Sequence, residues 1–205
     1  MVADQFATAV IIPIKSFDGA KERLAPNLSA VERHKLAMYM ATRVIAAANP
    51  FSVLIVCDDE EVARFANRHG AMAIHQRGTG LNNAVGEGLA AARDAGFTWA
   101  IIAHSDLPLA TRLDHLLDAS MSTTTVSLLG DQTGDGTNVL VIATDCAFDF
   151  HYGANSFRAH CEEATRRGYQ LRILEDAALA VDIDTPEDLV HLPANWQDSS
   201  VREFG

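Results

Sequence analysis

The chain of 205 residues has few cationic side chains and no long apolar run. Sixteen Lys and Arg stand against 27 Asp and Glu, which gives a formal net charge of −11. This balance excludes general binding to nucleic acids or to anionic membranes, because both need a cationic surface. No apolar run approaches the roughly 18 residues of a membrane-spanning helix, and no signal-peptide pattern opens the chain. We therefore expect a cytoplasmic protein with neither nucleic acid nor a membrane as partner.

Cysteine is also scarce, and the common signatures of nucleotide and metal sites are missing. The three cysteines are an odd number without CxxC spacing, which favours free thiols over a disulfide framework. There is no GxxxxGKS or GxxxxGKT loop, and the stretch GTGLNN fails the GxGxxG pattern at Asn83. The eight histidines include no HExxH pair, so a zinc site has little support. The stretch from Asp131 opens like an EF-hand, but Thr133 and Ile142 stand at positions three and twelve, which excludes calcium.

Short apolar runs alternate with helix-like segments along most of the chain. The first three runs are each followed by a helical segment, as right-handed crossovers require. Such alternation implies a mostly parallel mixed sheet with helices on both faces, in three α/β/α layers. The expected strands are 8–14, 52–57, 71–75, 99–103, 124–129, 139–143 and 171–174; the expected helices are 29–48, a segment after 58, 82–95, 111–120, 155–167 and a segment after 185.

Local signals fix where some of these helices begin. Ser29 and Glu32 form a capping-box pair, and Thr185 followed by Pro186 marks the start of the last helix. No internal repeat or linker divides the chain. We therefore expect a single domain over residues 1–192, followed by a polar tail over residues 193–205.

Three aspartates stand just after apolar runs, where ligands bind in a parallel sheet. Asp106 follows the run in AIIAHSDLPL, and ALAVDIDTPEDL adds Asp182 and Asp184. Alternation along an extended chain points this pair to one side and Ile183 to the other. Carboxylates on one side repel one another unless a cation or a proton lies between them, and Mg²⁺ prefers such ligands. The alternatives are a turn or capping role for Asp106 and a solvated strand end for the pair.

Other strand-end segments suit anions. Lys15, Lys21 and Arg23 crowd beyond the first apolar run of an otherwise acidic chain. YGANSFRAH places Gly153 just before a helix start at Ser156, and the free N–H groups of a helix N-terminus suit phosphate or carboxylate. The alternatives are a solvated loop for the cations and an ordinary turn with an N-cap for the glycine-rich segments.

Together these segments resemble one family. IPIKSFDGAKERLAPNLS, GTGLNNA, HSDLPL, GTNVL, YGANSF and DIDTPEDL occur in the order and with roughly the spacing of the 2-phospholactate and phosphoenolpyruvate guanylyltransferases of coenzyme F-420 biosynthesis. The resemblance covers about residues 9–190. Those enzymes belong to a nucleotidyltransferase superfamily with a GT-A-like fold, that of the nucleotide-diphospho-sugar transferases, and the resemblance implies the same fold here.

The resemblance implies an enzyme that transfers a guanylyl group from GTP to the phosphate of a small acid and releases pyrophosphate. Phosphoenolpyruvate, 2-phospho-L-lactate and 3-phospho-D-glycerate are the family's acceptors, and the sequence leaves the choice open. The product would be handed over to the transferase that couples the acid to a deazaflavin alcohol. The alternatives are another nucleotidyltransferase, such as a molybdenum-cofactor guanylyltransferase, and a non-catalytic nucleotide-binding protein.

The resemblance also implies roles for individual residues. Asp106 matches a metal-binding carboxylate, and Asp182 and Asp184 match an acidic pair near the same one or two Mg²⁺ ions. The catalytic residues implied besides Asp106 are Lys15, Lys21 and Arg23, along the triphosphate. The other residues implied to contact GTP are Pro13, Gly80, Leu81 and Asn82. The residues implied to hold the phosphorylated acid are Thr137, Gly153 and Ser156.

Overall fold

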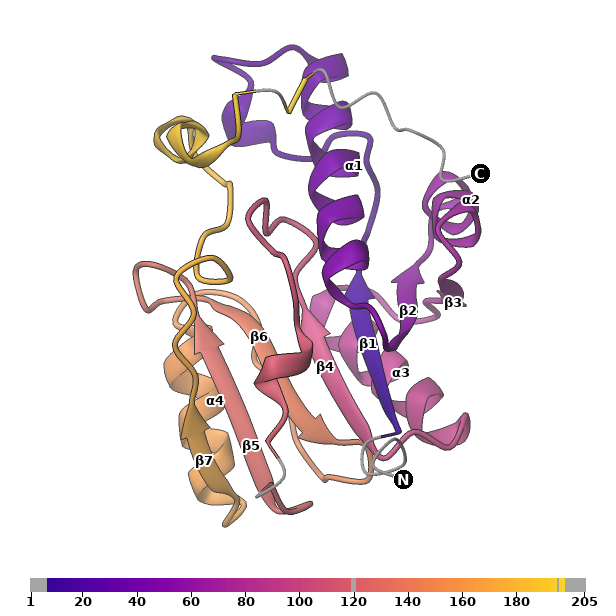
Figure 1. Ribbon diagram of the computed structural model, residues 1–205, viewed down its shortest axis with the longest axis vertical. Helices are drawn as coiled ribbons and strands as arrows, with labels where there is room; N and C mark the ends of the chain where they lie inside the picture. The colour runs from indigo at the N-terminus through magenta and orange to yellow at the C-terminus, as the bar shows by residue number, and fades with distance from the viewer. Residues whose placement is uncertain (1–6, 119–120, 195, 198–205) are drawn as a thin grey trace.

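The computed structural model describes residues 7–118, 121–194 and 196–197. Its centre is a seven-stranded sheet with the order β3-β2-β1-β4-β6-β5-β7 (Figure 1). Neighbouring strands are parallel except that β6 runs antiparallel to both β4 and β5. The strands are β1 (Thr8–Pro13), β2 (Ser52–Cys57), β3 (Met72–His75), β4 (Trp99–Ala103), β5 (Thr125–Gly130), β6 (Thr137–Ala143) and β7 (Gln170–Ile173).

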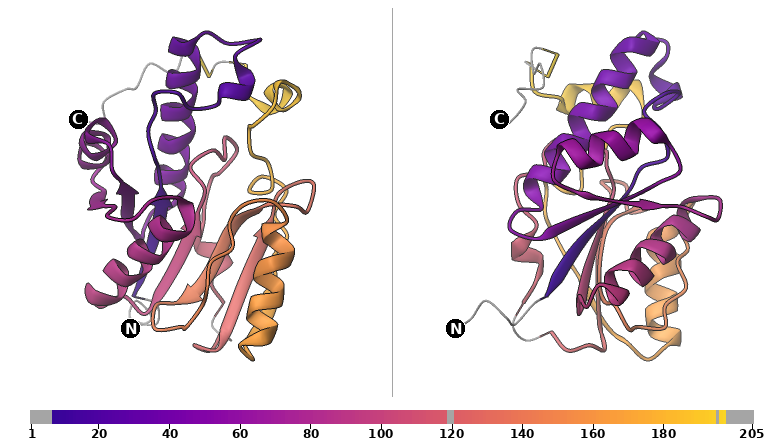
Figure 2. Two further views of the ribbon diagram at one scale, coloured as in Figure 1. Left: turned by 180° about the vertical axis from the view of Figure 1, so that it is seen from behind. Right: turned by 90° about the vertical axis from the view of Figure 1, so that its right-hand side faces the viewer.

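Helices cover both faces of this sheet (Figure 2). The helices α1 (Ala30–Ala47) and α2 (Glu60–Arg68) pack on one face, and α3 (Leu81–Asp94) and α4 (Ser156–Arg166) pack on the other. The side chains of β1 alternate between the two resulting cores: Val10 lies in the core under α1, and Ile11 lies in the core under α3. The expected three-layer α/β/α architecture is therefore confirmed. Among the described residues, no helix has the length and apolar character needed to cross a membrane.

The seven strands expected from the sequence are all present, with ends that agree within two residues. The expected helices over 29–48, 82–95 and 155–167, and the one after residue 58, are present as well. The capping box of Ser29 and Glu32 begins α1, and that of Thr185 and Asp188 begins a 3-10 helix over Pro186–His191. Of the polar tail expected over 193–205, residues 195 and 198–205 lie outside the described part.

The helix expected over residues 111–120 is wrong. The described part of this segment, which ends at residue 118, contains only a 3-10 turn over Asp114–Leu116. Leu113 and Leu116 are buried in the core. The backbone N–H of Leu113, however, donates to the carbonyl of Ala47 at the end of α1. Leu113 is thus tied to α1, and the segment forms only the i→i−3 bonds of a single 3-10 turn, from Leu116 to Leu113 and from Leu117 to Asp114. The spacing of the two leucines fits either this arrangement or a helix.

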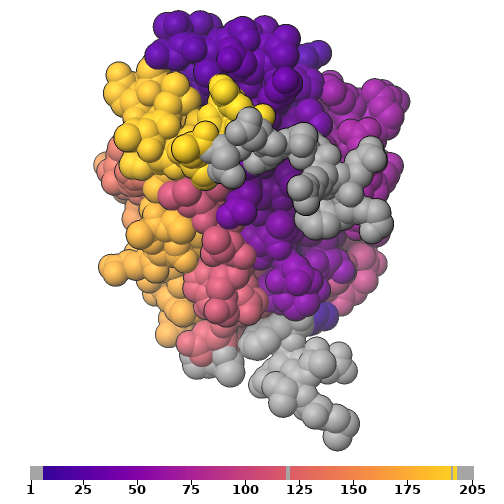
Figure 3. All heavy atoms as spheres, turned by 45° about the horizontal axis from the view of Figure 1, so that its top comes forward, coloured from indigo at the N-terminus to yellow at the C-terminus, as the bar shows by residue number. Residues whose placement is uncertain are grey.

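The segment that follows β1 and the C-terminal segment meet beyond the carboxyl ends of the parallel strands (Figure 1), and they lie side by side on the surface (Figure 3). A third apolar cluster joins them, in which Leu24 and Leu28 pack with Leu36 and Met40 of α1 and with Ile183. Because β6 is antiparallel, its first residues, Thr137 and Asn138, lie at this same edge of the sheet. The edge therefore collects segments that are far apart in the sequence.

Candidate active site

A carboxylate cluster of Asp106, Asp182 and Asp184 lies at this edge. Asp106 follows β4, and the pair comes from the segment after β7, where Ile183 is fully buried between them. One carboxylate oxygen from each aspartate lies within 4.8 Å of the others. The structure thus brings together the three acidic side chains that the sequence singled out. Their set of hard oxygen atoms is of the kind that binds a divalent cation.

Lys21 is the cation that reaches this cluster. Its Nζ lies 2.6 Å from Asp106 Oδ2 and 2.6 Å from Asp184 Oδ1, and the lysine side chain is only 12% exposed. Its backbone has a φ of 55°, in the left-handed region that residues other than glycine seldom adopt. Burial by itself would lower the pKa of Lys21, but the Asp106 and Asp184 carboxylates outweigh it and raise that pKa well above its usual range. The lysine is therefore a fixed positive charge within the cluster.

The single lysine does not neutralise three carboxylates. Burial, followed by the charges of Asp106 and Asp184, raises the pKa of Asp182 to about 6. Asp106 Oδ1 is buried and has no hydrogen-bond partner among the described residues, and the same is true of His104 Nε2. The unpartnered oxygen of Asp106 and the raised pKa of Asp182 both reflect negative charge that Lys21 alone does not offset.

Asn138 holds the segment that carries the acidic pair. It is buried at the second position of β6, and its side-chain Nδ2 donates to the carbonyls of Leu179 and Ala180, at 3.0 and 3.1 Å. These bonds fix the chain two residues before Asp182. No role for Asn138 was expected from the sequence; the available signal was an amide side chain within an otherwise apolar run.

A second group at the same edge is uncharged, and we call it the hydroxyl cluster: Thr137, Ser156 and His160. Thr137 begins β6, Ser156 begins α4, and His160 lies one helical turn further along. Ser156 Oγ donates to Thr137 Oγ1 at 3.3 Å, and His160 Nδ1 lies 2.9 Å from the same oxygen. All three side chains are buried, with 2% or less of each residue exposed. The family resemblance implied one acceptor site for Thr137 and Ser156 but gave no role to His160, whose only signal was its spacing of four from Ser156.

The loop before α4 closes over the hydroxyl cluster. Gly153 has a φ of 134° and Asn155 a φ of 57°, so the chain turns through two conformations that L-residues rarely adopt. The Asn155 backbone N–H donates to Asp135 Oδ1 at 3.1 Å, which ties this loop to the glycine-rich turn before β6. The predicted acceptor residues Thr137, Gly153 and Ser156 are thus neighbours in space.

Aromatic rings link the two clusters. The rings of His104 and Tyr152 are 5.3 Å apart, and those of Tyr152 and His160 are 4.7 Å apart. His104 Nδ1 lies 3.9 Å from Asp106 Oδ1 at the charged end. The His104 backbone N–H donates to the carbonyl of Asn138, which fixes this ring beside the start of β6. One continuous row of side chains therefore runs from the carboxylates to the hydroxyls.

The remaining predicted nucleotide contacts lie around this centre. Pro13 ends β1, and Lys15 and Arg23 are exposed; neither of these two cations makes an ion pair with any described residue. Gly80 is the N-cap residue of α3, with a φ of 85°, and Leu81 is 37% exposed. Of the three cations that follow β1, only Lys21 contacts the described carboxylates.

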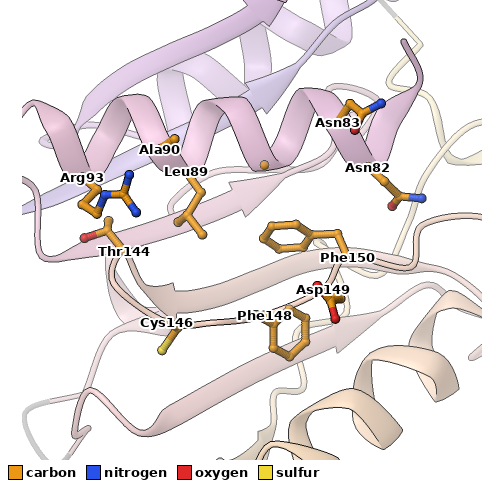
Figure 4. A pocket seen from close by; sticks show the side chains of 11 residues that line it. Asn82, Asn83, Leu89, Ala90, Arg93, Thr144, Cys146, Phe148, Asp149 and Phe150 are labelled. Carbon is orange, nitrogen blue, oxygen red and sulfur yellow. The ribbon is translucent and has the colours of Figure 1, made fainter. Parts of the chain in front are cut away.

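Asn82 is engaged by the loop before α4. Its Oδ1 accepts from the backbone N–H of Tyr152 at 2.7 Å, and its Nδ2 donates to the carbonyl of the same residue at 3.4 Å. Asn82 also lines a cavity of about 350 Å³ between α3 and the segment after β6, with Leu89, Phe148 and Phe150 among its walls (Figure 4). None of the three carboxylates lines this cavity, so it is separate from the charged end of the site.

A second pair of carboxylates, those of Asp18 and Glu61, lies around His34 near the start of α1. His34 Nδ1 lies 3.0 Å from Asp18 Oδ1, and His34 Nε2 lies 3.3 Å from Glu61 Oε1. The imidazole thus bridges the two carboxylates with both of its nitrogens. Asp18, to which the sequence assigned no role, therefore belongs to a surface contact between the loop after β1, α1 and α2.

Comparisons with known proteins identify the family of the chain. The family described as "Guanylyl transferase CofC like" matches residues 8–204. A phosphoenolpyruvate guanylyltransferase from Rubrobacter xylanophilus is 35% identical over 190 residues, which cover 90% of this chain and 93% of that protein. A 2-phospho-L-lactate guanylyltransferase from Methanocaldococcus jannaschii is 32% identical over 197 residues, which cover 95% of this chain and 86% of that protein.

Solved structures share the fold. A nucleotide-diphospho-sugar transferase from Desulfovibrio desulfuricans has a TM-score of 0.72 at 17% identity, covering 96% of this chain and 90% of its own. A nucleotidyl transferase from Methanothermobacter thermautotrophicus has a TM-score of 0.66 at 16% identity, covering 93% and 98%. The GT-A-like nucleotidyltransferase fold expected from the six motifs is confirmed. With a family match over nearly its whole length, the chain belongs to the CofC-like guanylyltransferases, enzymes that act on a nucleotide and a small molecule.

Proposed function

We propose that the protein transfers the guanylyl group of GTP to the phosphate of a small phosphorylated acid in coenzyme F-420 biosynthesis, with release of pyrophosphate. The proposed acceptors are phosphoenolpyruvate, 2-phospho-L-lactate and 3-phospho-D-glycerate. The first two are named in the relatives from Rubrobacter and Methanocaldococcus. The observation that carries the proposal is the pairing, at one edge of the sheet, of a carboxylate cluster with a neutral hydroxyl cluster.

The proposed reaction is an in-line displacement at the α-phosphorus of GTP. An oxygen of the acceptor phosphate forms the new P–O bond, and the bond to the oxygen that bridges to the β-phosphate breaks. Pyrophosphate leaves with the bonding electron pair. The acceptor is already anionic at neutral pH, because the second pKa of a phosphate monoester is about 6. No general base is required, and the task of the protein is to bring two anions together.

The charged end would hold the triphosphate. Asp106, Asp182 and Asp184 fit one or two Mg²⁺ ions, which would supply positive charge against the α-phosphate and the acceptor. Lys21 would exchange its carboxylate partners for phosphate oxygens when GTP arrives. Lys15 and Arg23 are exposed on the same loop, where they would offset the charge that grows on the departing pyrophosphate.

The neutral end would hold the acceptor. Thr137 and Ser156 would donate hydrogen bonds to its phosphate or carboxylate, together with the backbone N–H of Gly153. The nucleotide would contact the end of β1 at Pro13 and the start of α3 at Gly80, Leu81 and Asn82. For Asn82 this contact would involve atoms that remain free after its two bonds to the Tyr152 backbone.

The product would join two phosphates in an anhydride, which water hydrolyses in time. We propose that the protein works in the cytoplasm and passes this product to the transferase that couples the acid to a deazaflavin alcohol. We propose that residues 1–192 form one guanylyltransferase domain and that residues 193–205 form a polar tail.

Incubation with GTP and Mg²⁺ tests the proposal. Each of the three acids is supplied separately, and released pyrophosphate is measured with a coupled assay. We expect release with at least one acid and none without acid. A second series replaces GTP by ATP or CTP, and a third omits Mg²⁺ and adds EDTA. Absence of release with every acid would refute the proposed function, whereas release without metal would refute the role of the carboxylate cluster.

A further inference from the structure

His160 is the part of the hydroxyl cluster that the proposed chemistry does not yet use. It lies on α4 and is fully buried, and both of its ring nitrogens are engaged. Nε2 lies 2.9 Å from the backbone nitrogen of His151, and Nδ1 lies 2.9 Å from Thr137 Oγ1. These two contacts decide where the ring carries its proton.

A backbone N–H can only donate, so His160 Nε2 must accept and must carry no proton. The ring proton of the neutral imidazole is therefore on Nδ1, and Nδ1–H donates to Thr137 Oγ1. Burial, followed by the charges of the neighbouring His151 and His104, lowers the pKa of His160 to about 4. The ring is thus neutral at physiological pH.

The hydroxyl of Thr137 can then act only as a hydrogen-bond donor. Its oxygen accepts from His160 Nδ1–H and from Ser156 Oγ–H, so both lone pairs are occupied. Its own proton is directed away from both partners. Such a hydroxyl can bind an oxygen anion only as a donor, and it needs no reorientation when the anion arrives.

We infer that His160 is a positioning residue for acceptor binding, which fixes the Thr137 hydroxyl as a hydrogen-bond donor to the phosphorylated acid and holds the loop around Gly153 through the His151 backbone. The inference rests on the proposed function, since it assigns the acceptor to the hydroxyl cluster. His160 itself does not touch the acceptor. The Tyr152 ring packs edge-on against the imidazole at 4.7 Å, which couples the loop and the hydroxyl in one unit.

Two amide substitutions separate the two contacts of the ring. Asn places an amide nitrogen near the position of Nδ1, so His160→Asn retains a donor to Thr137 and loses the acceptor for His151. Gln reaches the position of Nε2, so His160→Gln retains the acceptor for His151 and loses the donor to Thr137. The two variants are matched in chemistry and differ only in which contact survives.

We expect His160→Gln to raise the KM for the phosphorylated acid about tenfold or more, because the acid loses a fixed hydrogen-bond donor to its charged group. The KM for GTP and the turnover at saturating acid should change less than about twofold. His160→Asn should keep the KM for the acid within about threefold. An unchanged KM for the acid in His160→Gln would overturn the positioning role, as would equal losses for both substrates.

A double-mutant cycle sharpens the test. Thr137→Val removes the hydroxyl in the wild-type background and should raise the KM for the acid about tenfold or more. Combined with His160→Gln it should add little, because both changes remove the same donor. Independent, multiplicative effects would show that the two side chains act separately and would contradict the inference. Thermal unfolding of each variant confirms that the compared proteins are folded.

Nitrogen-15 NMR of the histidine ring tests the tautomer directly. We expect the wild-type protein at neutral pH to show a protonated Nδ1 and an unprotonated Nε2 at His160. A protonated Nε2 would overturn the inference whatever the kinetics show. If the wild type acts on none of the three acids, the proposed function fails and the role of His160 fails with it. If the wild type is active and His160→Gln is unaltered, only the positioning role fails.

Discussion

The carboxylate cluster and the hydroxyl cluster lie at the same edge of one sheet, yet they are stabilised in opposite ways. The carboxylate cluster gathers three acidic side chains around one lysine and leaves Asp106 Oδ1 without a partner among the described residues. In the hydroxyl cluster, each of the three side chains contacts another member through a hydrogen bond. The charged end would therefore gain stability from an incoming cation, whereas the side chains of the neutral end are already organised by their own hydrogen bonds.

The two ends of the site also differ in how they stabilise a left-handed backbone conformation. Lys21 and Asn155 are the non-glycine residues with positive φ in the described part of the chain, and one belongs to each end of the site. Asn tolerates the left-handed region because its short side chain bonds locally, whereas Lys gains nothing of that kind. At Lys21 the two carboxylates offset the unfavourable conformation. The charged end thus holds backbone strain as well as electrostatic repulsion.

Asp106→Asn should give the largest effect on catalysis. The substitution keeps the size of the side chain and removes the charge that is paired with Lys21 and orphaned at Oδ1. We expect turnover to fall at least about a hundredfold, the range found when a group that stabilises a transition state is removed. The fold should stay intact, as measured by circular dichroism. Turnover within about tenfold of wild type would remove Asp106 from the metal site.

Lys21→Met compared with Arg23→Met should give the next largest effect. Lys21 contacts two carboxylates and is nearly buried, whereas Arg23 is exposed on the same loop. We expect a loss in kcat/KM for GTP of about tenfold or more for Lys21→Met, and less than about threefold for Arg23→Met, because exposed charges are screened by solvent. Steady-state kinetics over a range of GTP concentrations measures both. Equal losses would mean that position on the loop matters more than contact with the carboxylates.

Thr137→Val tests the neutral end by stability. The substitution is nearly isosteric, but it leaves the Ser156 hydroxyl and the His160 Nδ1–H without their acceptor in a buried place. We expect the free energy of unfolding to fall by about 1–3 kcal/mol, the usual penalty for an unsatisfied buried group. Urea denaturation of the protein without ligands measures the change. A more stable variant would show that the hydroxyl cluster is not pre-organised by its hydrogen bonds.

The sequence was most informative where structure depends on local pattern. The apolar runs predicted all seven strands, and the capping pair of Ser29 and Glu32 predicted the start of α1. The three aspartates could be placed together because each follows a strand or an extended segment, and such ends share one edge. The segment over 111–120 failed because two buried leucines three residues apart fit a helix and an anchored loop equally well.

Long-range geometry was beyond the sequence. The antiparallel direction of β6 places the first residues of that strand, Thr137 and Asn138, at the edge where the parallel strands end. Nothing in the local pattern shows this direction. Likewise, Lys21, the cation that contacts the carboxylates, has a left-handed backbone angle, and no propensity predicts that angle for lysine.

Asp182→Asn should give the smallest effect, and it should raise the free energy of unfolding, whereas Thr137→Val at the neutral end should lower it. The folded-state pKa of Asp182 is raised to about 6 from the ordinary 3.8, so the folded protein binds this proton more tightly than the unfolded chain does. Stability is therefore lost as pH rises from about 4 to about 6, and the loss is complete above that range. A neutral Asn avoids the loss.

We expect the Asp182→Asn variant, in EDTA, to be more stable than wild type by about 1–2 kcal/mol at pH 7.5 and equal to it near pH 4, as measured by urea denaturation. The matched change Glu175→Gln, at an exposed residue of the same segment, should leave stability unchanged at both pH values. A variant that is no more stable than wild type at pH 7.5 would mean that Lys21 already neutralises the carboxylate cluster, and the contrast between the two ends would then be one of position alone.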